Sequence, residues 1–170
     1  MIRLATADDA AGLAALAAET FPLACPPGNR PEDIQAFIDG NLTEAHFALY
    51  LGDPDKAILT TDDYAGYTLL VFKEPTDPDV VAAITTRPSV ELSKCYVRAS
   101  AHGTGLASEL MLATLDHARS RGAAAAWLGV NEHNAKANRF YEKNGFVKVG
   151  NKRFRLGDKW EDDFVRERVL

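Results

Sequence analysis

The chain is poor in cysteine, with only Cys25 and Cys95 among its 170 residues. Two cysteines do not make the disulfide framework of a small secreted protein, and no CxxC or histidine-rich spacing typical of a metal site is present. Cys95 stands in an alternating, strand-like segment, so we expect a small buried thiol there. The sequence therefore predicts no metal ligands.

Long apolar runs are also missing. No stretch approaches the roughly 18 apolar residues that a membrane-spanning helix needs. The segment 1–6 lacks the basic region and apolar stretch of a signal peptide. We therefore expect a cytoplasmic protein without a membrane partner.

The chain has fewer basic than acidic residues: 19 Lys and Arg against 24 Asp and Glu, which gives a net charge of −5. The absence of a basic stripe argues against a nucleic-acid partner, and the acidic balance mildly favours cationic small molecules. Hydrophobic residues make up 46% of the chain and charged residues 25%, which is typical of a globular enzyme. The length predicts one domain over residues 1–170.

The order of periodic segments predicts a mixed α/β domain with a mostly antiparallel sheet. Two proline-bearing segments, 22–31 and 74–88, are predicted to be loops. The expected strands cover 2–5, 57–61, 65–73, 89–97, 124–130, 146–156 and 163–169. The expected helices cover 8–20, 31–38, 43–51, 105–121 and 134–144.

The most informative segment joins the strand at 89–97 to the helix at 105–121. It carries Gly103 and Gly105, which let the backbone approach an anion closely. The first N–H groups of a helix have no partner inside the helix and attract phosphate. A dinucleotide fingerprint is disfavoured because Ser108 stands at its third glycine position and too little chain remains for a doubly wound sheet.

A second segment follows after one strand and opens the helix at 134–144. Asn134, Ala137 and Tyr141 stand on one face of that helix. The turn and this helix together resemble the GNAT superfamily of acyl-CoA-dependent N-acetyltransferases over roughly residues 89–150. The matching residues are His102-x-x-Gly105-x-Ala107, then Asn134, Ala137, Phe140-Tyr141 and Gly145-Phe146.

The resemblance implies a GNAT fold, with a mixed, mostly antiparallel twisted sheet of about six to seven strands and about four helices. It implies acetyl-CoA as the cosubstrate, its pantetheine arm lying between two splayed strands, 89–97 and 124–130. The backbone of Tyr96 and Val97 and the side chain of Asn134 would hold the arm. The pyrophosphate would lie on the backbone of His102, Gly103, Thr104, Gly105, Leu106 and Ala107.

Two of the cofactor residues keep an alternative interpretation. His102 replaces the Arg or Gln usual in the family, so it is either a phosphate contact or a solvated turn residue. Lys143 either reaches the adenosine 3′-phosphate or is a solvent-facing lysine of the helix.

Acetyl transfer to an amine needs a base, because an alkyl ammonium with a pKa near ~10.4 has no free lone pair. Glu91, in the strand beside the cofactor, is the candidate base; it could instead bind a cationic substrate or pair with a neighbouring cation. By resemblance, Tyr141 is the general acid toward the leaving thiolate; its alternative is an aromatic core residue.

The segment 154–163, together with residues 91–97 and 127–130, resembles the PaiA-type polyamine acetyltransferase branch. Its acidic residues and Trp160 suggest a site for a cation. The acceptor is therefore predicted to be a polyamine or another small primary amine. An amino acid, an antibiotic, a protein or peptide amine and a non-catalytic acyl-CoA sensor stay open, as does a monomer or a homodimer.

Overall fold

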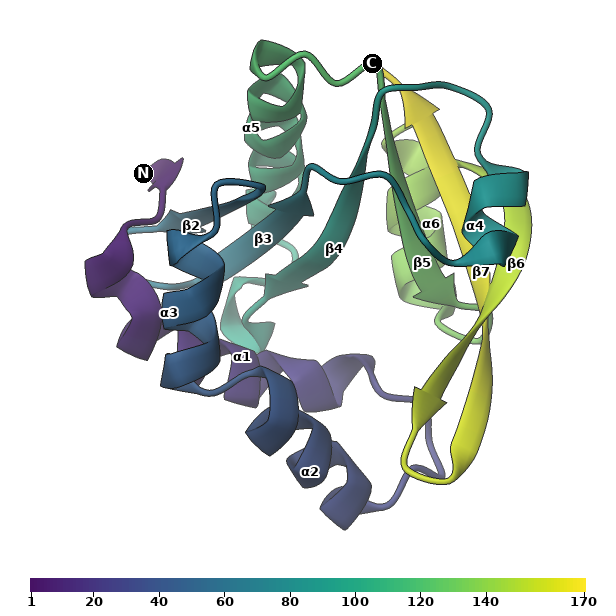
Figure 1. The fold of residues 1–170 in the computed structure, drawn as a ribbon. Helices are drawn as coiled ribbons and strands as arrows, with labels where there is room; N and C mark the ends of the chain where they lie inside the picture. The colour runs from purple at the N-terminus through teal and green to yellow at the C-terminus, as the bar shows by residue number, and fades with distance from the viewer.

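The computed structural model describes residues 1–170 and is built on one seven-stranded sheet with the order β1-β2-β3-β4-β5-β7-β6. Its neighbouring strands are antiparallel except for the parallel pair β4–β5. The strands are β1 Ile2–Leu4, β2 Lys56–Thr61, β3 Gly66–Val71, β4 Ser89–Val97, β5 Ala125–Asn131, β6 Val147–Leu156 and β7 Lys159–Val169. The predicted mixed, mostly antiparallel fold is confirmed (Figure 1).

The structure has six α-helices, where the sequence pattern predicted five and the family resemblance implied about four. They are α1 Ala10–Ala24, α2 Pro31–Asn41, α3 Glu44–Gly52, α4 Pro78–Ala83, α5 Leu106–Ser120 and α6 Ala135–Lys143. Helix α4 lies in the segment that was predicted to be a loop. It begins with Asp77, whose side chain caps the helix, and with Pro78 in the first turn. Burial of Val80 and Ile84 against Trp127 holds this short helix on the sheet.

Two further boundaries differ from the prediction. Helix α1 continues through Pro22 to Ala24, so the predicted loop starts at Cys25. Pro22 has no N–H to donate to the carbonyl of residue 18, so the helix lacks one hydrogen bond there, and it ends two residues later at Ala24. Strand β7 starts at Lys159, before the predicted residue 163, because the acidic segment pairs with β6 along its whole length.

The two faces of the sheet are covered by different helices. Helices α1, α2 and α3 pack on one face, in a cluster that includes Tyr67 and Leu69 of β3. Helix α5 packs on the other face, against Leu70 of β3 and against β4 and β5. Residues 69 and 70 thus belong to opposite cores, as strand alternation requires.

Strands β4 and β5 pair only at their beginnings, where Ser89–Glu91 lie opposite Ala125–Trp127. Beyond Glu91 the two strands diverge, as Figure 1 shows. Just after this point β4 carries a bulge, because Leu70 pairs with Leu92 whereas Leu69 pairs with Lys94. Ser93 is therefore the extra residue, and the bulge bends β4 away from β5. The predicted splay of these two strands is present.

Candidate active site

Two neighbouring cavities occupy the space where β4 and β5 have separated. The first has a volume of about 480 Å³ and extends along the start of α5 and one face of α6. The second has a volume of about 310 Å³ and lies toward α1, α2 and the β6–β7 hairpin. The residues that line both are Ala24, Cys95, Tyr96, Asn134, Ala137 and Tyr141. A ligand in one cavity therefore lies next to a ligand in the other.

The turn before α5 presents free backbone donors to the first cavity. Gly103 and Gly105 have φ angles of 79° and 86°, in the left-handed region that favours glycine. The N–H groups of Gly103, Gly105, Ala107 and Ser108 have no hydrogen-bond partner within the chain. These donors lie at the positive end of the α5 dipole, so this part of the cavity suits a phosphate group.

The predicted phosphate residues do not all face the cavity. His102, Gly103, Gly105 and Ala107 line it, whereas Thr104 and Leu106 do not. The Thr104 hydroxyl instead donates to the Ala101 carbonyl over 2.6 Å and stabilises the turn.

His102 is exposed but connected to its neighbours. Its Nε2 lies 2.9 Å from the Val97 carbonyl oxygen, and its Nδ1 lies 3.0 Å from Nζ of Lys136 on α6. The Lys136 ammonium donates to Nδ1, so the neutral ring with its proton on Nε2 satisfies both contacts. His102 thus links the end of β4 to α6. Lys136 and Lys143 add positive charge to the same cavity.

The hydrogen-bond pattern between β3 and β4 determines which backbone groups of β4 point into the gap between β4 and β5. The Arg98 N–H donates to the Ala65 carbonyl over 2.8 Å. Because hydrogen-bonded pairs alternate in an antiparallel ladder, Tyr96 pairs with β3, while the backbone groups of Cys95 and Val97 point toward β5. Both residues line the first cavity, but only Val97 has its backbone groups turned toward β5, whereas those of Tyr96 pair with β3.

Asn134 caps α6 and keeps one donor free. Its Oδ1 accepts from the Ala137 N–H over 3.1 Å, while Nδ2 has no partner within the chain. Tyr141 lies two turns further along α6, and its hydroxyl likewise makes no hydrogen bond within the chain. Burial raises the pKa of Tyr141 well above its ordinary value, so the phenol keeps its proton at neutral pH.

The position of α6 depends on a buried network that the sequence analysis missed. Arg166 of β7 donates from Nε to Oδ1 of Asn138 over 2.9 Å and from Nη1 to the Phe146 carbonyl over 3.1 Å. Nδ2 of Asn138 donates to the Asn131 carbonyl over 3.0 Å. The one signal in the sequence was an asparagine in the middle of a helix, a position where this residue is unfavourable without a partner.

Glu91 lies in the second cavity, at the point where β4 and β5 separate. Its carboxylate makes no salt bridge to Lys94 or Arg98; Arg98 instead pairs with Glu19 over 2.7 Å. Burial raises the pKa of Glu91, and the nearby Lys152 and Lys94 offset this effect only in part. A carboxylate of this kind accepts a proton near neutral pH more readily than an exposed one.

The acidic C-terminal segment is divided between the cavity and the surface. Glu161 and Asp163 are buried and line the second cavity, whereas Asp158 and Asp162 are exposed. Burial raises the pKa of Asp163 to about 6.

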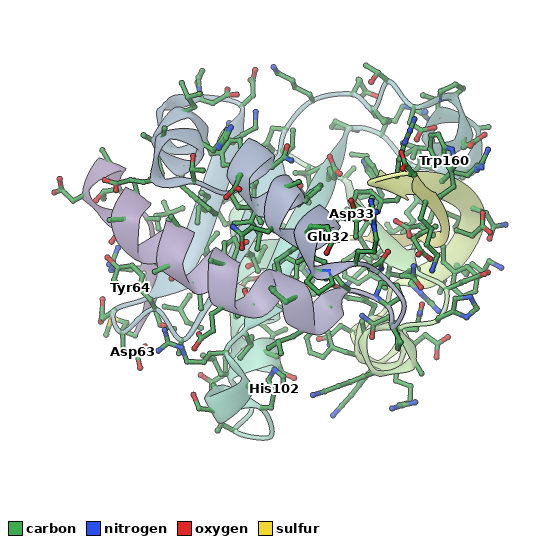
Figure 2. All side chains as sticks on the ribbon, turned by 90° about the horizontal axis from the view of Figure 1, so that it is seen from below. Glu32, Asp33, Asp63, Tyr64, His102 and Trp160 are labelled. Atoms are coloured by element: carbon green, nitrogen blue, oxygen red, sulfur yellow. The ribbon has the colours of Figure 1, made fainter.

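Trp160 is not part of the second cavity. It is an exposed residue of the β6–β7 hairpin, labelled in Figure 2, with the Arg153 guanidinium 4.5 Å from its ring centroid. It therefore does not provide the aromatic face that was expected for a substrate cation.

Neither cysteine has the features of a reactive thiol. Cys95 lines both cavities, but burial raises the pKa of its thiol to about 12. Burial also raises the pKa of Cys25 to about 11. Both thiols are therefore protonated and poorly nucleophilic. No group of three or more His, Cys, Asp or Glu side chains is placed to hold a metal ion.

Comparison with known proteins identifies the class to which this fold and site belong. The sequence pattern of the Acetyltransferase (GNAT) family matches residues 13–146. An uncharacterized N-acetyltransferase of Mycobacterium tuberculosis is 47% identical over 165 residues, which cover 95% of this chain and 98% of the relative. An uncharacterized N-acetyltransferase of Lactobacillus delbrueckii subsp. lactis, from the pepI 3′ region, is 28% identical over 92% of this chain and 89% of the relative. The chain belongs to the GNAT family and is an N-acetyltransferase, an acyltransferase.

Solved structures share the fold at low sequence identity. The PaiA N-acetyltransferase of Thermoplasma acidophilum in complex with coenzyme A superposes with a TM-score of 0.77 at 19% identity, over 100% of this chain and 98% of that one. YncA of Salmonella typhimurium with its cofactor acetyl-CoA has a TM-score of 0.67 at 20% identity, over 100% of this chain and 93% of that one. None of the helices in the present structure is long and apolar enough to cross a membrane.

Proposed function

We propose that this protein transfers an acetyl group from acetyl-CoA to a primary amine by direct attack. The observation that carries the proposal is the pair of cavities that meet at Cys95, Tyr96, Asn134 and Tyr141. A thioester held in the first cavity and an amine held in the second are brought together there. Such positioning supplies a large part of the rate enhancement in bimolecular reactions.

The residues that line the first cavity support acetyl-CoA as its ligand. Free N–H groups at Gly103, Gly105, Ala107 and Ser108 suit the pyrophosphate, and Lys143 suits the 3′-phosphate. The free Nδ2 of Asn134 and the backbone of Val97 suit the amides of the pantetheine arm. His102 supports this part of the site by its contact with the Val97 carbonyl, in place of a longer basic side chain.

The transfer forms a nitrogen–carbon bond to the acetyl group and breaks the carbon–sulfur bond of the thioester, whose electron pair leaves on sulfur. Glu91 accepts the proton that the attacking ammonium must lose, directly or through water. The Cys95 N–H, which points into the gap, is placed to stabilise negative charge on the acetyl oxygen. Tyr141 donates its phenolic proton to the departing sulfur, and the second proton that the new amide nitrogen loses restores the phenol, directly or through water. The protonated thiol of Cys95 supports a route without an acyl-enzyme.

The acceptor is proposed to be a small molecule with a primary amine. Three carboxylates that line the second cavity, Glu91, Glu161 and Asp163, support binding of a cation. The resemblance of the C-terminal segment to the PaiA-type branch makes polyamines one class to be tested. We further propose that residues 1–170 form one catalytic domain that acts in the cytoplasm.

The test is release of free thiol from acetyl-CoA in the presence of a panel of amines, together with calorimetry of acetyl-CoA binding. The panel contains polyamines, diamines, aminoglycosides, amino acids, their amides and short peptides. Turnover that depends on both acetyl-CoA and a primary amine is expected. Acetyl-CoA binding without turnover of any amine would contradict the proposal and point to an acyl-CoA sensor.

A further inference from the structure

The second cavity contains four charged side chains that have no partner within the chain. Glu91, Lys94, Lys152 and Asp163 all line it, and none of them takes part in a salt bridge or a side-chain hydrogen bond. Buried charges elsewhere in the molecule have partners: Arg3 holds Asp9 at 2.8 Å, and Arg166 holds Glu142 at 3.1 Å. The buried Glu167 accepts a hydrogen bond of 2.6 Å from the Thr85 hydroxyl. Burying a charge without a partner is costly, so a cavity with four such groups is built for a charged ligand.

The sheet brings these groups together although they are far apart in the chain. Glu91 lies opposite Trp127, and Asp163 lies between Asn131 and Lys152 in the paired strands. Residues 127, 129 and 131 of β5 share a face, so Glu91, Asp163 and Lys152 point to the same side of the sheet.

Gly129 allows Lys152 to reach the centre of the cavity. A side chain at residue 129 would meet Cδ of Lys152 at 3.2 Å and Oδ2 of Asp163 at 3.3 Å. The stem of Lys152 therefore crosses β7 and passes over Gly129 toward the cleft. Lys152 is the cation that most lowers the pKa of Glu91, and it also lowers the pKa of Asp163. Its ammonium nevertheless lies beyond salt-bridge distance of both carboxylates.

The second cavity contains charges of both signs, which restricts the charges that a bound ligand can carry. Glu91, Asp163 and Glu161 attract a cation, and Oε1 of Glu161 is a buried acceptor without a hydrogen bond, although Lys159 Nζ lies 3.3 Å away. Lys94 and Lys152 attract an anion and repel any second ammonium of a polycation. Burial lowers the pKa of Lys94, so an anionic ligand would also stabilise its charged form.

We propose that the acceptor is a small zwitterion, a primary amine that carries a carboxylate in the same molecule, and that Lys152 and Lys94 bind this carboxylate. This inference rests on the proposed acetyl transfer and narrows its acceptor class away from polyamines. The carboxylates at Glu161 and Asp163 hold the ammonium, and Glu91 takes its proton. A volume of about 310 Å³ suits a ligand of amino-acid size.

The experiment compares matched acceptors with the wild-type protein. Each amino acid of a panel is tested beside its carboxamide and its decarboxylated amine, for example ornithine beside putrescine and lysine beside cadaverine. A site that binds a charged group of its substrate rejects analogues that lack this group. The value of kcat/KM should therefore be at least tenfold higher for each amino acid than for its carboxamide or its decarboxylated amine. Equal or better turnover of the amides or diamines would overturn the inference and leave the proposed function intact. Silence with all of these acceptors would overturn the inference, and silence across the wider amine panel as well would overturn the proposed function.

Substitution of Lys152 gives a second, independent result. Lys152→Met keeps the stem over Gly129 and removes the charge. It should lower kcat/KM for amino carboxylates by about 10- to 100-fold, as for loss of a hydrogen bond to a charged group, while the acetyl-CoA Kd stays unchanged. The preference for an acid over its amide should fall toward one. Lys148→Met is the matched control, because Lys148 is an exposed lysine of the same strand that lies over the Phe164 ring. An unchanged acid-to-amide ratio in Lys152→Met would contradict the inference.

Discussion

Arg166 of β7 donates a hydrogen bond of 2.9 Å to Asn138 of α6, and both side chains are buried. In the sequence, Asn138 lies between Asn134, the cap of α6, and Tyr141, and both of these residues line the two cavities. The pair therefore fixes the helix that carries the proposed acid on the sheet. A guanidinium in this environment is stable only while its partners are present.

Asn138→Ala should lower the free energy of unfolding by about 2 kcal/mol, because a buried charged donor loses its acceptor. Denaturant unfolding measures this value. The control is Arg139→Ala, an exposed neighbour on the same helix, for which little change is expected. Equal effects of the two substitutions would mean that the Arg166 contact does not stabilise the fold.

Gly105→Glu should abolish acetyl-CoA binding, because it places a carboxylate beside the free N–H groups at the start of α5. Calorimetry measures the loss. The matched control is Gly122→Glu at the other end of α5, where φ is 88°, close to the 86° of Gly105. At both glycines the space around an added Cβ is open. Both variants therefore carry the same left-handed strain, and only Gly105→Glu should lose the ligand. Retained affinity in Gly105→Glu would remove the turn from the cofactor site.

The elements around the first cavity could be predicted because each is specified by local sequence. The strand at 89–97 follows from its alternating pattern and its bounding residues, and α6 from its cap at Asn134 and its glycine at 145. Helix α4 could not be predicted in the same way. It has six residues, fewer than two helical turns, so its apolar pattern does not repeat. The helix exists because its apolar residues pack on β5.

The second cavity could be predicted only in part, because its residues come from distant parts of the chain. Glu91 and Asp163 were noted from the sequence as possible parts of a cation site. Lys152 and its route over Gly129 were not foreseen, since they depend on β7 lying between β5 and β6 in the sheet. Strand order is a long-range property that no local pattern contains.

Tyr141→Phe should lower kcat by tenfold or more, with little change in the acetyl-CoA Kd, because it removes only the proton donor. Steady-state kinetics and calorimetry measure the two effects. Tyr67→Phe is the control: its hydroxyl is also buried without a hydrogen bond, but Tyr67 lies in the core beneath α3 and lines neither cavity. Wild-type turnover in Tyr141→Phe would exclude Tyr141 from the mechanism.

Glu91→Gln should change the pH dependence of kcat/KM as well as its size. In the wild type the acidic limb reports ionisation of a carboxyl whose pKa is raised by burial. Without that carboxylate, activity should keep rising with pH as free amine becomes available, toward the ordinary alkyl ammonium pKa of about 10.4. Glu44→Gln, on an exposed part of α3, should leave the profile unchanged. An unaltered profile in Glu91→Gln would restrict Glu91 to binding the substrate.

Asp163 should make the fold less stable as the pH rises from about 4 to about 6. Its pKa is 3.8 as an ordinary group and about 6 in the folded protein, where it is buried beside Glu161. The folded state therefore holds a proton that the unfolded state has released, and this contribution to stability is lost as the pH rises through the folded pKa. The loss amounts to about 2 kcal/mol once solvent screening is allowed for.

The Asp163→Asn variant lacks this titrating group, so the difference in unfolding free energy between the variant and the wild type should grow over this pH range. A difference that stays constant with pH would mean that Asp163 remains ionised in the fold, paired with Lys152.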